Sequence, residues 1–265
     1  MAISALINRH VFTTRVFDSG ALTVLASVIH QFSKPGLYYV TIRRGDAVLG
    51  TTRFEVSAES GTTQLNLDLA VAASPSAVRR SFVRSARGAS AADCNCGGAR
   101  GTTAGAHEAT AAATPAVSPK GYVQFFVSQG EGGLSASVAR ADGDKVVFDT
   151  TTLGSGDLFA LSLIAPATFS MVNKLGSATG TSSVTFSKEV ARRLKATAPV
   201  YVDASKSAFA PKDIQLSSGQ GLVFRVTDAA RIVVTQESEP VQAAARDRRD
   251  ARTFRRLRPL SQPKV

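Results

Sequence analysis

The chain has 265 residues, of which 44% are hydrophobic, and it carries a formal net charge of +11. This length fits one large or two ordinary domains. No apolar run reaches the roughly 18 residues that a membrane-spanning helix needs. The only two cysteines, Cys94 and Cys96, are separated by a single residue and cannot form a disulfide framework. These features exclude a helical membrane protein and a disulfide-rich small domain.

The positive charge is concentrated in two segments, residues 71–120 and 246–265, where Arg and Lys outnumber Asp and Glu. The rest of the chain is nearly neutral. Both segments are poor in large apolar residues, so we expect the charge to lie on flexible arms and not in a rigid basic groove. The first residues show neither the basic start nor the long apolar core of a secretory signal, which favours a cytoplasmic location.

Residues 1–70 predict a small β-domain. Tyr38, Val40 and Ile42 alternate with more polar neighbours, the period of two that is typical of a strand with one buried face. A Gly-Asp pair at 45–46 then suits a tight turn. Similar β-rich runs bounded by turn residues predict strands at 11–17, 21–32, 37–43, 47–56 and 63–69.

A fainter copy of this hairpin sequence occurs at Pro166 to Phe186. When the two segments are aligned on their prolines, three positions are identical, and an aromatic and an aliphatic position correspond in kind. The identical pairs are Pro35/Pro166, Gly45/Gly176 and Ala47/Ala178. An internal repeat and chance both remain open as explanations. Either way, the pattern predicts hairpins whose proline-led aromatic strand enters a core.

Residues 71–119 predict a disordered linker between two domains. Ala, Ser, Gly, Thr and Arg fill this segment, which therefore buries too little apolar surface to offset the entropy cost of ordering. Cys94 and Cys96 lie in it, with His107 downstream. Their spacing is not that of a zinc module, which uses four donors, but these three residues could contribute to a metal site. Exposed thiols without a ligand are the alternative.

Residues 120–238 predict a larger β-sandwich domain. Regularly spaced short strands favour two packed sheets. The one interior helical candidate is residues 188–196, with Val190 and Leu194 one turn apart. The predicted strands are 122–128, 134–140, 145–150, 157–164, 168–173, 182–187, 200–203, 213–217, 222–227 and 231–236. The predicted fold class is all-β: two β-sandwich-like domains, a linker, and a basic tail at 239–265.

Residues 200–226 contain Phe209, Pro211 and Ile214, a turn glycine at 219, and Val-Phe at 223–224. In these positions the segment resembles the opening strands of cupredoxins. The resemblance implies a β-sandwich and, in that family, histidine and cysteine copper ligands further on. No His or Cys follows His107 in this chain, and a blue-copper centre needs both donor types. The resemblance therefore implies a β-sandwich fold but no copper site. The alternative interpretation is that residues 200–226 form a β-hairpin of a kind found in any sandwich.

The other histidines, His10 and His30, fall in the first β-region, and no catalytic motif accompanies them. The apolar surroundings of His30 predict a partly buried strand residue. Glycine-rich stretches at 130–133 and 142–144 are typical of hairpin turns and lack the features of phosphate or calcium loops. We therefore expect no enzymatic activity and no cofactor.

The C-terminal tail is the strongest candidate for a partner-binding element. The guanidinium group of arginine pairs bidentately with phosphate and carboxylate, and one Phe could add an apolar contact. The predicted contact residues are Arg246, Arg248, Arg249, Arg252, Phe254, Arg255, Arg256 and Arg258. A solvated tail without a partner is the alternative.

These observations predict a non-enzymatic structural or interaction protein that binds a protein partner or a second copy of itself. Two alternatives stay open. One is a cupredoxin-like ligand- or metal-binding protein that uses Cys94 and Cys96. The other is a nucleic-acid-associated protein that binds through its tail.

Overall fold

The structure is a computed structural model that describes residues 10–74, 114–143, 145–186 and 197–238. Within these ranges the chain is mostly strand, and its helices are two single turns, α1 (His10–Thr13) and α2 (Leu69–Ala72). The predicted mostly-β fold class is confirmed. The helix predicted at 188–196, most of the predicted linker and the basic tail lie outside the described residues.

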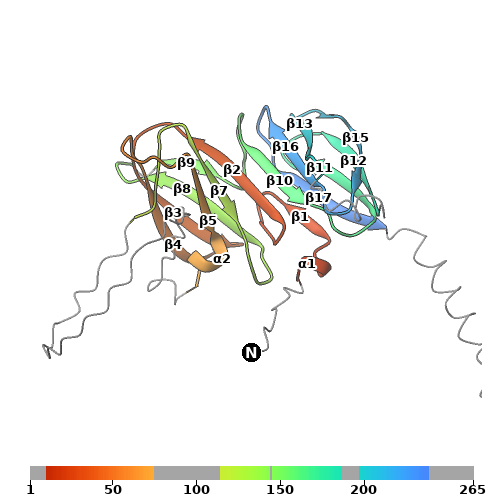
Figure 1. Cartoon of the computed structure of the whole chain (residues 1–265), viewed down its shortest axis with the longest axis horizontal. Helices are drawn as coiled ribbons and strands as arrows, with labels where there is room; N and C mark the ends of the chain where they lie inside the picture. The colour runs from red at the N-terminus through yellow and green to blue at the C-terminus, as the bar shows by residue number, and fades with distance from the viewer. Residues whose placement is uncertain (1–9, 75–113, 144, 187–196, 239–265) are drawn as a thin grey trace, which may run out of the picture.

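The strands of the described residues form three sheets (Figure 1). The seven-stranded sheet comprises, in spatial order, β14 (Phe209–Ala210), β13 (Val200–Ala204), β16 (Gly221–Val226), β10 (Leu158–Ser162), β2 (Ala26–Phe32), β7 (Gly121–Phe126) and β5 (Gln64–Asp68). One five-stranded sheet comprises β6 (Ala116–Val117), β4 (Ala47–Val56), β3 (Gly36–Arg44), β8 (Leu134–Arg140) and β9 (Val146–Asp149). The other comprises β1 (Val16–Asp18), β17 (Ile232–Ser238), β11 (Thr168–Asn173), β12 (Thr179–Thr185) and β15 (Asp213–Ser217).

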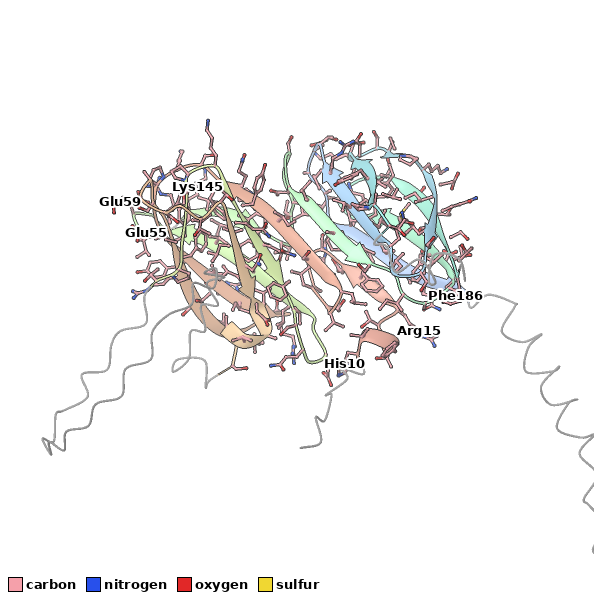
Figure 2. All side chains as sticks on the ribbon, in the orientation of Figure 1. His10, Arg15, Glu55, Glu59, Lys145 and Phe186 are labelled. Atoms are coloured by element: carbon pink, nitrogen blue, oxygen red, sulfur yellow. The ribbon has the colours of Figure 1, made fainter. Side chains whose placement is uncertain are left out.

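Two sandwiches share the seven-stranded sheet. The first sandwich joins β2, β5 and β7 to the sheet that contains β9, and the second joins β10, β13, β14 and β16 to the sheet that contains β1. In Figure 1, β2 and β10 lie side by side where the sandwiches meet. Figure 2 shows Glu55 and Phe186 at opposite ends of the molecule, with side chains filling the space between the sheets.

A single apolar core runs through both sandwiches. Because side chains alternate along a strand, Phe125, Phe159 and Phe224 all point to the same, fully buried face of the seven-stranded sheet. Phe125 stacks on Phe148 of β9 with ring centroids 5.2 Å apart. Full burial of each such side chain contributes about 1.5–3 kcal/mol. The shared core means that the sandwiches are not independent packing units.

Apart from β14, the described strands of the second sandwich repeat those of the first. Each strand of the first has a counterpart: β2 with β10, β3 with β11, β4 with β12, β5 with β13, β6 with β15, β7 with β16 and β8 with β17. The unusual pairings repeat as well, because β4 is parallel to β6 as β12 is to β15, and β5 is parallel to β7 as β13 is to β16. The hairpins that begin at Pro35 and Pro166 are counterparts, as the alignment of their sequences suggested.

The correspondence holds residue by residue over 16–44 and 147–175. The tripeptide Val-Phe-Asp occurs at 16–18 and again at 147–149. Leu22 bridges to the start of β8, and its counterpart Leu153 bridges to Ala230, just before β17. The next turn places Leu25 at φ +68° and its counterpart Gly156 at φ +91°. The backbone path is therefore duplicated, and so are many of the buried apolar positions.

The halves also exchange a strand. β1 precedes β2 in the chain but pairs with β17 in the second sandwich. Its counterpart β9 precedes β10 but pairs with β8 in the first sandwich. At the centre, β2 and β10 pair antiparallel, and the equivalent residues Val28 and Phe159 lie opposite each other. The arrangement is that of a strand-swapped dimer within one chain.

The observed pairing crosses the predicted division into domains 1–70 and 120–238. β7 and β8 follow the predicted linker, yet they pair with β2, β3 and β5, which precede it. The two-residue period shows that one face of a strand is buried, but it carries no information about the neighbouring strand. At the start of the chain, the strand predicted at 11–17 is instead α1 followed by β1. Thr14 closes that helical turn by donating to the His10 carbonyl from both its N–H and its hydroxyl.

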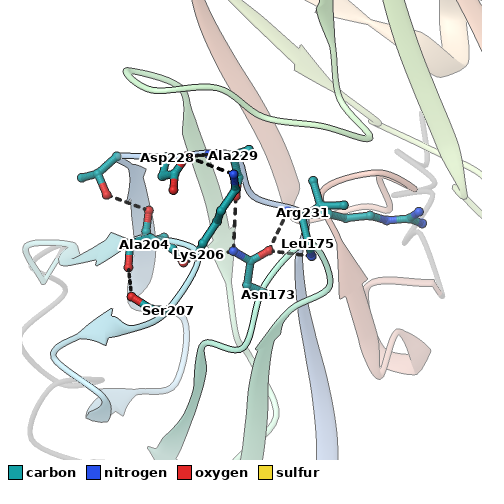
Figure 3. A network of polar contacts seen from close by, with 10 residues as sticks. Asn173, Leu175, Ala204, Lys206, Ser207, Asp228, Ala229 and Arg231 are labelled. Atoms are coloured by element: carbon teal, nitrogen blue, oxygen red, sulfur yellow. Dashed lines mark hydrogen bonds and ion pairs between the residues drawn. The ribbon is translucent and has the colours of Figure 1, made fainter.

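A buried asparagine organises the loops at one end of the second sandwich (Figure 3). The Asn173 amide nitrogen donates to the carbonyls of Ser205 and Ala229, at 3.0 Å and 3.5 Å. Its oxygen accepts from the N–H groups of Leu175 and Arg231, both at 3.0 Å. Since Asn173 is fully buried, this one side chain satisfies backbone groups that would otherwise lose their hydrogen bonds on burial. It thereby fixes the short loop before β17.

Candidate functional site

The seven-stranded sheet has one face that no described element covers. Its strands point Val28, Phe125 and Phe159 into the core, so the alternate residues point outward. These outward side chains are mostly exposed or half-buried. Hydrogen-bonded neighbours on this side include Gln124, Ile29, Leu158 and Arg225, which come from both sandwiches. We call this surface the open face.

Each half contributes one exposed tyrosine to the open face. Tyr122 of β7 is 43% exposed and Tyr201 of β13 is 51% exposed. Tyr122 lies between Gln31 and Gln64 on the adjacent strands. Tyr201 lies against Arg225, whose guanidinium carbon is 5.6 Å from the ring centroid. Tyrosine provides a large, rigid contact area at low conformational cost, which is why it is enriched in protein interfaces.

The charged side chains on the open face already have hydrogen-bonding partners within the protein. Arg225 donates from Nε to Asp203 at 2.8 Å. Asp68 at the end of β5 caps α2 by accepting from Ala70 N–H at 3.0 Å. Docking on the open face would therefore not require an unpaired charge to lose its water, which is the usual cost of covering a charged surface. The face is suited to a flat, mostly uncharged partner surface.

The residues predicted to bind ligands or partners lie elsewhere in the chain. Cys94, Cys96 and His107 fall within 75–113, outside the described residues, and so do the arginines and Phe254 of the tail. Over the described part of the chain, no group of three or more His, Cys, Asp or Glu side chains could hold a metal ion. No described helix is long and apolar enough to span a membrane.

The segment that resembles cupredoxins contributes to both sheets of the second sandwich. Its residues form β13, β14, β15 and β16, of which β15 pairs with β12 and the others join the seven-stranded sheet. Phe209, Ile214 and Phe224 are buried, and Gly219 has φ +81° at the turn between β15 and β16. The positions on which the resemblance rests are thus core and turn residues of a sandwich.

From the sequence, Tyr122 and Tyr201 can be identified only as outward-facing residues on two separate strands. Tyr122 and Tyr201 alternate with buried residues just as other polar strand residues do. That they lie on one surface depends on the pairing of β2 with β10, which no local pattern encodes.

Comparison of the chain with family models, with curated proteins and with solved structures returned no match.

Proposed function

We propose that this protein is a structural or interaction protein built from two β-sandwich modules, and that it self-associates through the open face. The observation that carries the proposal is the continuity of that face across both sandwiches, with an exposed tyrosine in each half and its charges already paired. Exposed apolar and aromatic surface of this kind is characteristic of interaction sites.

The size of the face suits a weak to moderate interface. Seven strands spaced about 4.8 Å apart, each with about five residues rising 3.3 Å, cover roughly 500–600 Å². Two copies would bury about 1,000–1,200 Å² in total, which is near the lower limit for a specific protein–protein interface. Face-to-face packing of two such sheets is a common arrangement. A reversible dimer is therefore the expected species.

The test is sedimentation velocity over a range of protein concentrations. Replacing both Tyr122 and Tyr201 with Lys places like charges opposite each other in the dimer, and we expect the dissociation constant to rise at least about tenfold. Tyr39→Lys is the matched control, because Tyr39 is 44% exposed but lies on the outer face of the first five-stranded sheet. The dissociation constant of the Tyr39→Lys dimer should be unchanged.

Two outcomes would overturn the proposal. The first is a chain that stays monomeric at all accessible concentrations. The second is an equal loss of association in the Tyr39→Lys control, which would mean that general charge and not the open face governs assembly. Truncation after Glu239 separates this reading from docking through the tail, since the truncated chain keeps the open face and should still dimerise.

A further inference from the structure

An open pocket of about 270 Å³ lies beside the junction of the sandwiches. Its walls are strand β9 and the turn at residues 152–157, and His30 of β2 also lines it. Val146 and Val147, which are 48% and 41% exposed, supply an aliphatic wall. The volume is just below the range of roughly 300–1,000 Å³ that is typical of small-molecule sites. It fits a ligand of only a few heavy atoms.

His30 is held in one orientation by a buried carboxylate. Its Nδ1 lies 2.5 Å from Asp157 Oδ1, and Asp157 Oδ2 accepts from the Gly154 N–H at 2.7 Å. The imidazole ring also packs against Phe32 and Phe148, each with centroids 4.5 Å away. When a carboxylate accepts from Nδ1–H, the lone pair of the neutral ring is on Nε2. That nitrogen has no hydrogen-bond partner among the described residues.

The duplicated half shows that the fold does not need this polar pair. The residues equivalent to His30 and Asp157 are Leu161 and Ala26, which are likewise paired with each other and buried. An apolar pair therefore fits this position in the sheet. Burying a carboxylate costs free energy that an apolar residue does not. A polar pair retained in only one half, at a pocket, indicates a function other than packing.

A difference in loop length accounts for the open pocket. In one half, residues 127–133 join β7 to β8 and fold onto the turn at 22–25; a Cβ on Gly132 would lie 2.7 Å from Thr23 Cα. In the other half, only residues 227–229 precede Ala230, and Asn173 holds them in place. Val24 is consequently buried, whereas its counterpart Ser155 is exposed and lines the pocket.

The pocket also contains a carboxylate that lacks the cation present in the other half. Asp18 binds Arg231 through both oxygens, at 3.1 Å and 2.8 Å, and these hydrogen bonds raise the pKa of Arg231 above its ordinary value. The equivalent of Asp18 is Asp149, and the equivalent of Arg231 is Ser135. Asp149 accepts hydrogen bonds from Thr151 and forms no ion pair with any described residue.

We propose that this pocket binds a small protonated aliphatic amine. The ammonium group would donate to His30 Nε2 and pair with the Asp149 carboxylate, while the alkyl part would lie on Val146 and Val147. No Lys or Arg is among the described residues that line the pocket. The ligand supplies to Asp149 the positive charge that Arg231 supplies to Asp18.

The test titrates the full chain with isobutylammonium chloride and follows the backbone amide signals of Gly154, Ser155 and Gly156 by NMR. We expect a saturable shift at these residues, and at least about tenfold weaker binding by isobutanol, which has the same shape without the charge. Nα-acetyl-lysine methylamide serves as a second probe. Its binding would show that the site also accepts the ammonium group of a lysine side chain.

Two variants distinguish the proposed contacts from nonspecific effects. Asp149→Asn should weaken amine binding at least about tenfold, whereas Asp46→Asn, an exposed aspartate in the turn between β3 and β4, should leave it unchanged. The double variant His30→Leu with Asp157→Ala copies the apolar pair of the other half and should abolish binding while keeping the fold. Equal binding of amine and alcohol, or no effect of Asp149→Asn, would overturn the proposal. Because none of these substitutions touches Tyr122 or Tyr201, failure here leaves the self-association proposal standing.

Discussion

The two sandwiches share most of their buried apolar positions, whereas several of their polar side chains differ. Buried positions recur in equivalent places, as in Phe17/Phe148, Leu22/Leu153, Phe125/Phe224 and Val138/Val234. Two polar sites are particular to one half: Asn173 of the second sandwich corresponds to the buried Ile42 of the first, and the His30–Asp157 pair corresponds to Leu161 and Ala26. The comparison separates the residues that build the common fold from the residues that are particular to one half.

The largest effect is expected from the equivalent core phenylalanines. Phe125→Ala and Phe224→Ala each remove a fully buried ring, so each should lower the free energy of unfolding by about 3–5 kcal/mol. Because the halves exchange β1 and β9 and share one core, both substitutions should shift the same single transition. Urea unfolding followed by circular dichroism, together with calorimetry, measures this. Two separate transitions, each moved by only one substitution, would show that the sandwiches unfold independently.

A second prediction concerns the equivalent positions Asn173 and Ile42, each of which is replaced with the residue of the other half. Asn173→Ile installs the residue of the other half and leaves two carbonyls and two N–H groups without their partner. We expect a loss of about 3 kcal/mol in unfolding free energy, since each unpaired buried group costs about 1–3 kcal/mol and water recovers part of it. The reciprocal Ile42→Asn should also destabilise, because it buries an amide where no partner has been built.

An Asn173→Ile variant as stable as the parent would contradict the role given to this side chain. Hydrogen exchange adds a local readout. The amides of Leu175 and Arg231 should lose protection in Asn173→Ile, while amides in β3 and β8 of the first sandwich should keep theirs.

Local patterns predicted the strands well because each strand buries one face. The strands predicted at 134–140, 168–173 and 213–217 coincide with β8, β11 and β15. Two-residue strands such as β6 and β14, and the single-turn helix α2, were not predicted, since so few residues carry no period. The alternation is a property of each segment alone, so it does not depend on which strand becomes the neighbour.

Pairing and the candidate sites could not be predicted in this way. The exchange of β1 and β9, and the junction of β2 with β10, join residues far apart in the chain. His30 was correctly expected to be a partly buried strand residue, but its partner Asp157 belongs to the other half. Extending the alignment at Pro35 and Pro166 back to the Val-Phe-Asp tripeptides would have shown the duplication, but not which strands of the two halves pair.

The smallest predicted effect concerns the turn that occurs in both halves, with Leu25 at φ +68° and Gly156 at φ +91°. A side chain in this conformation costs about 1–2 kcal/mol. Leu25 offsets that strain because it packs against the core, whereas a Cβ at Gly156 would contact nothing within 4 Å. Gly156→Ala should therefore lower the melting temperature, with a loss of about 1 kcal/mol. Gly154→Ala is the control, since its Cβ would meet only an Asp157 oxygen at 3.8 Å and its φ is not positive. If the two variants melted together, strain at Gly156 would not explain why this half uses glycine where its copy uses leucine.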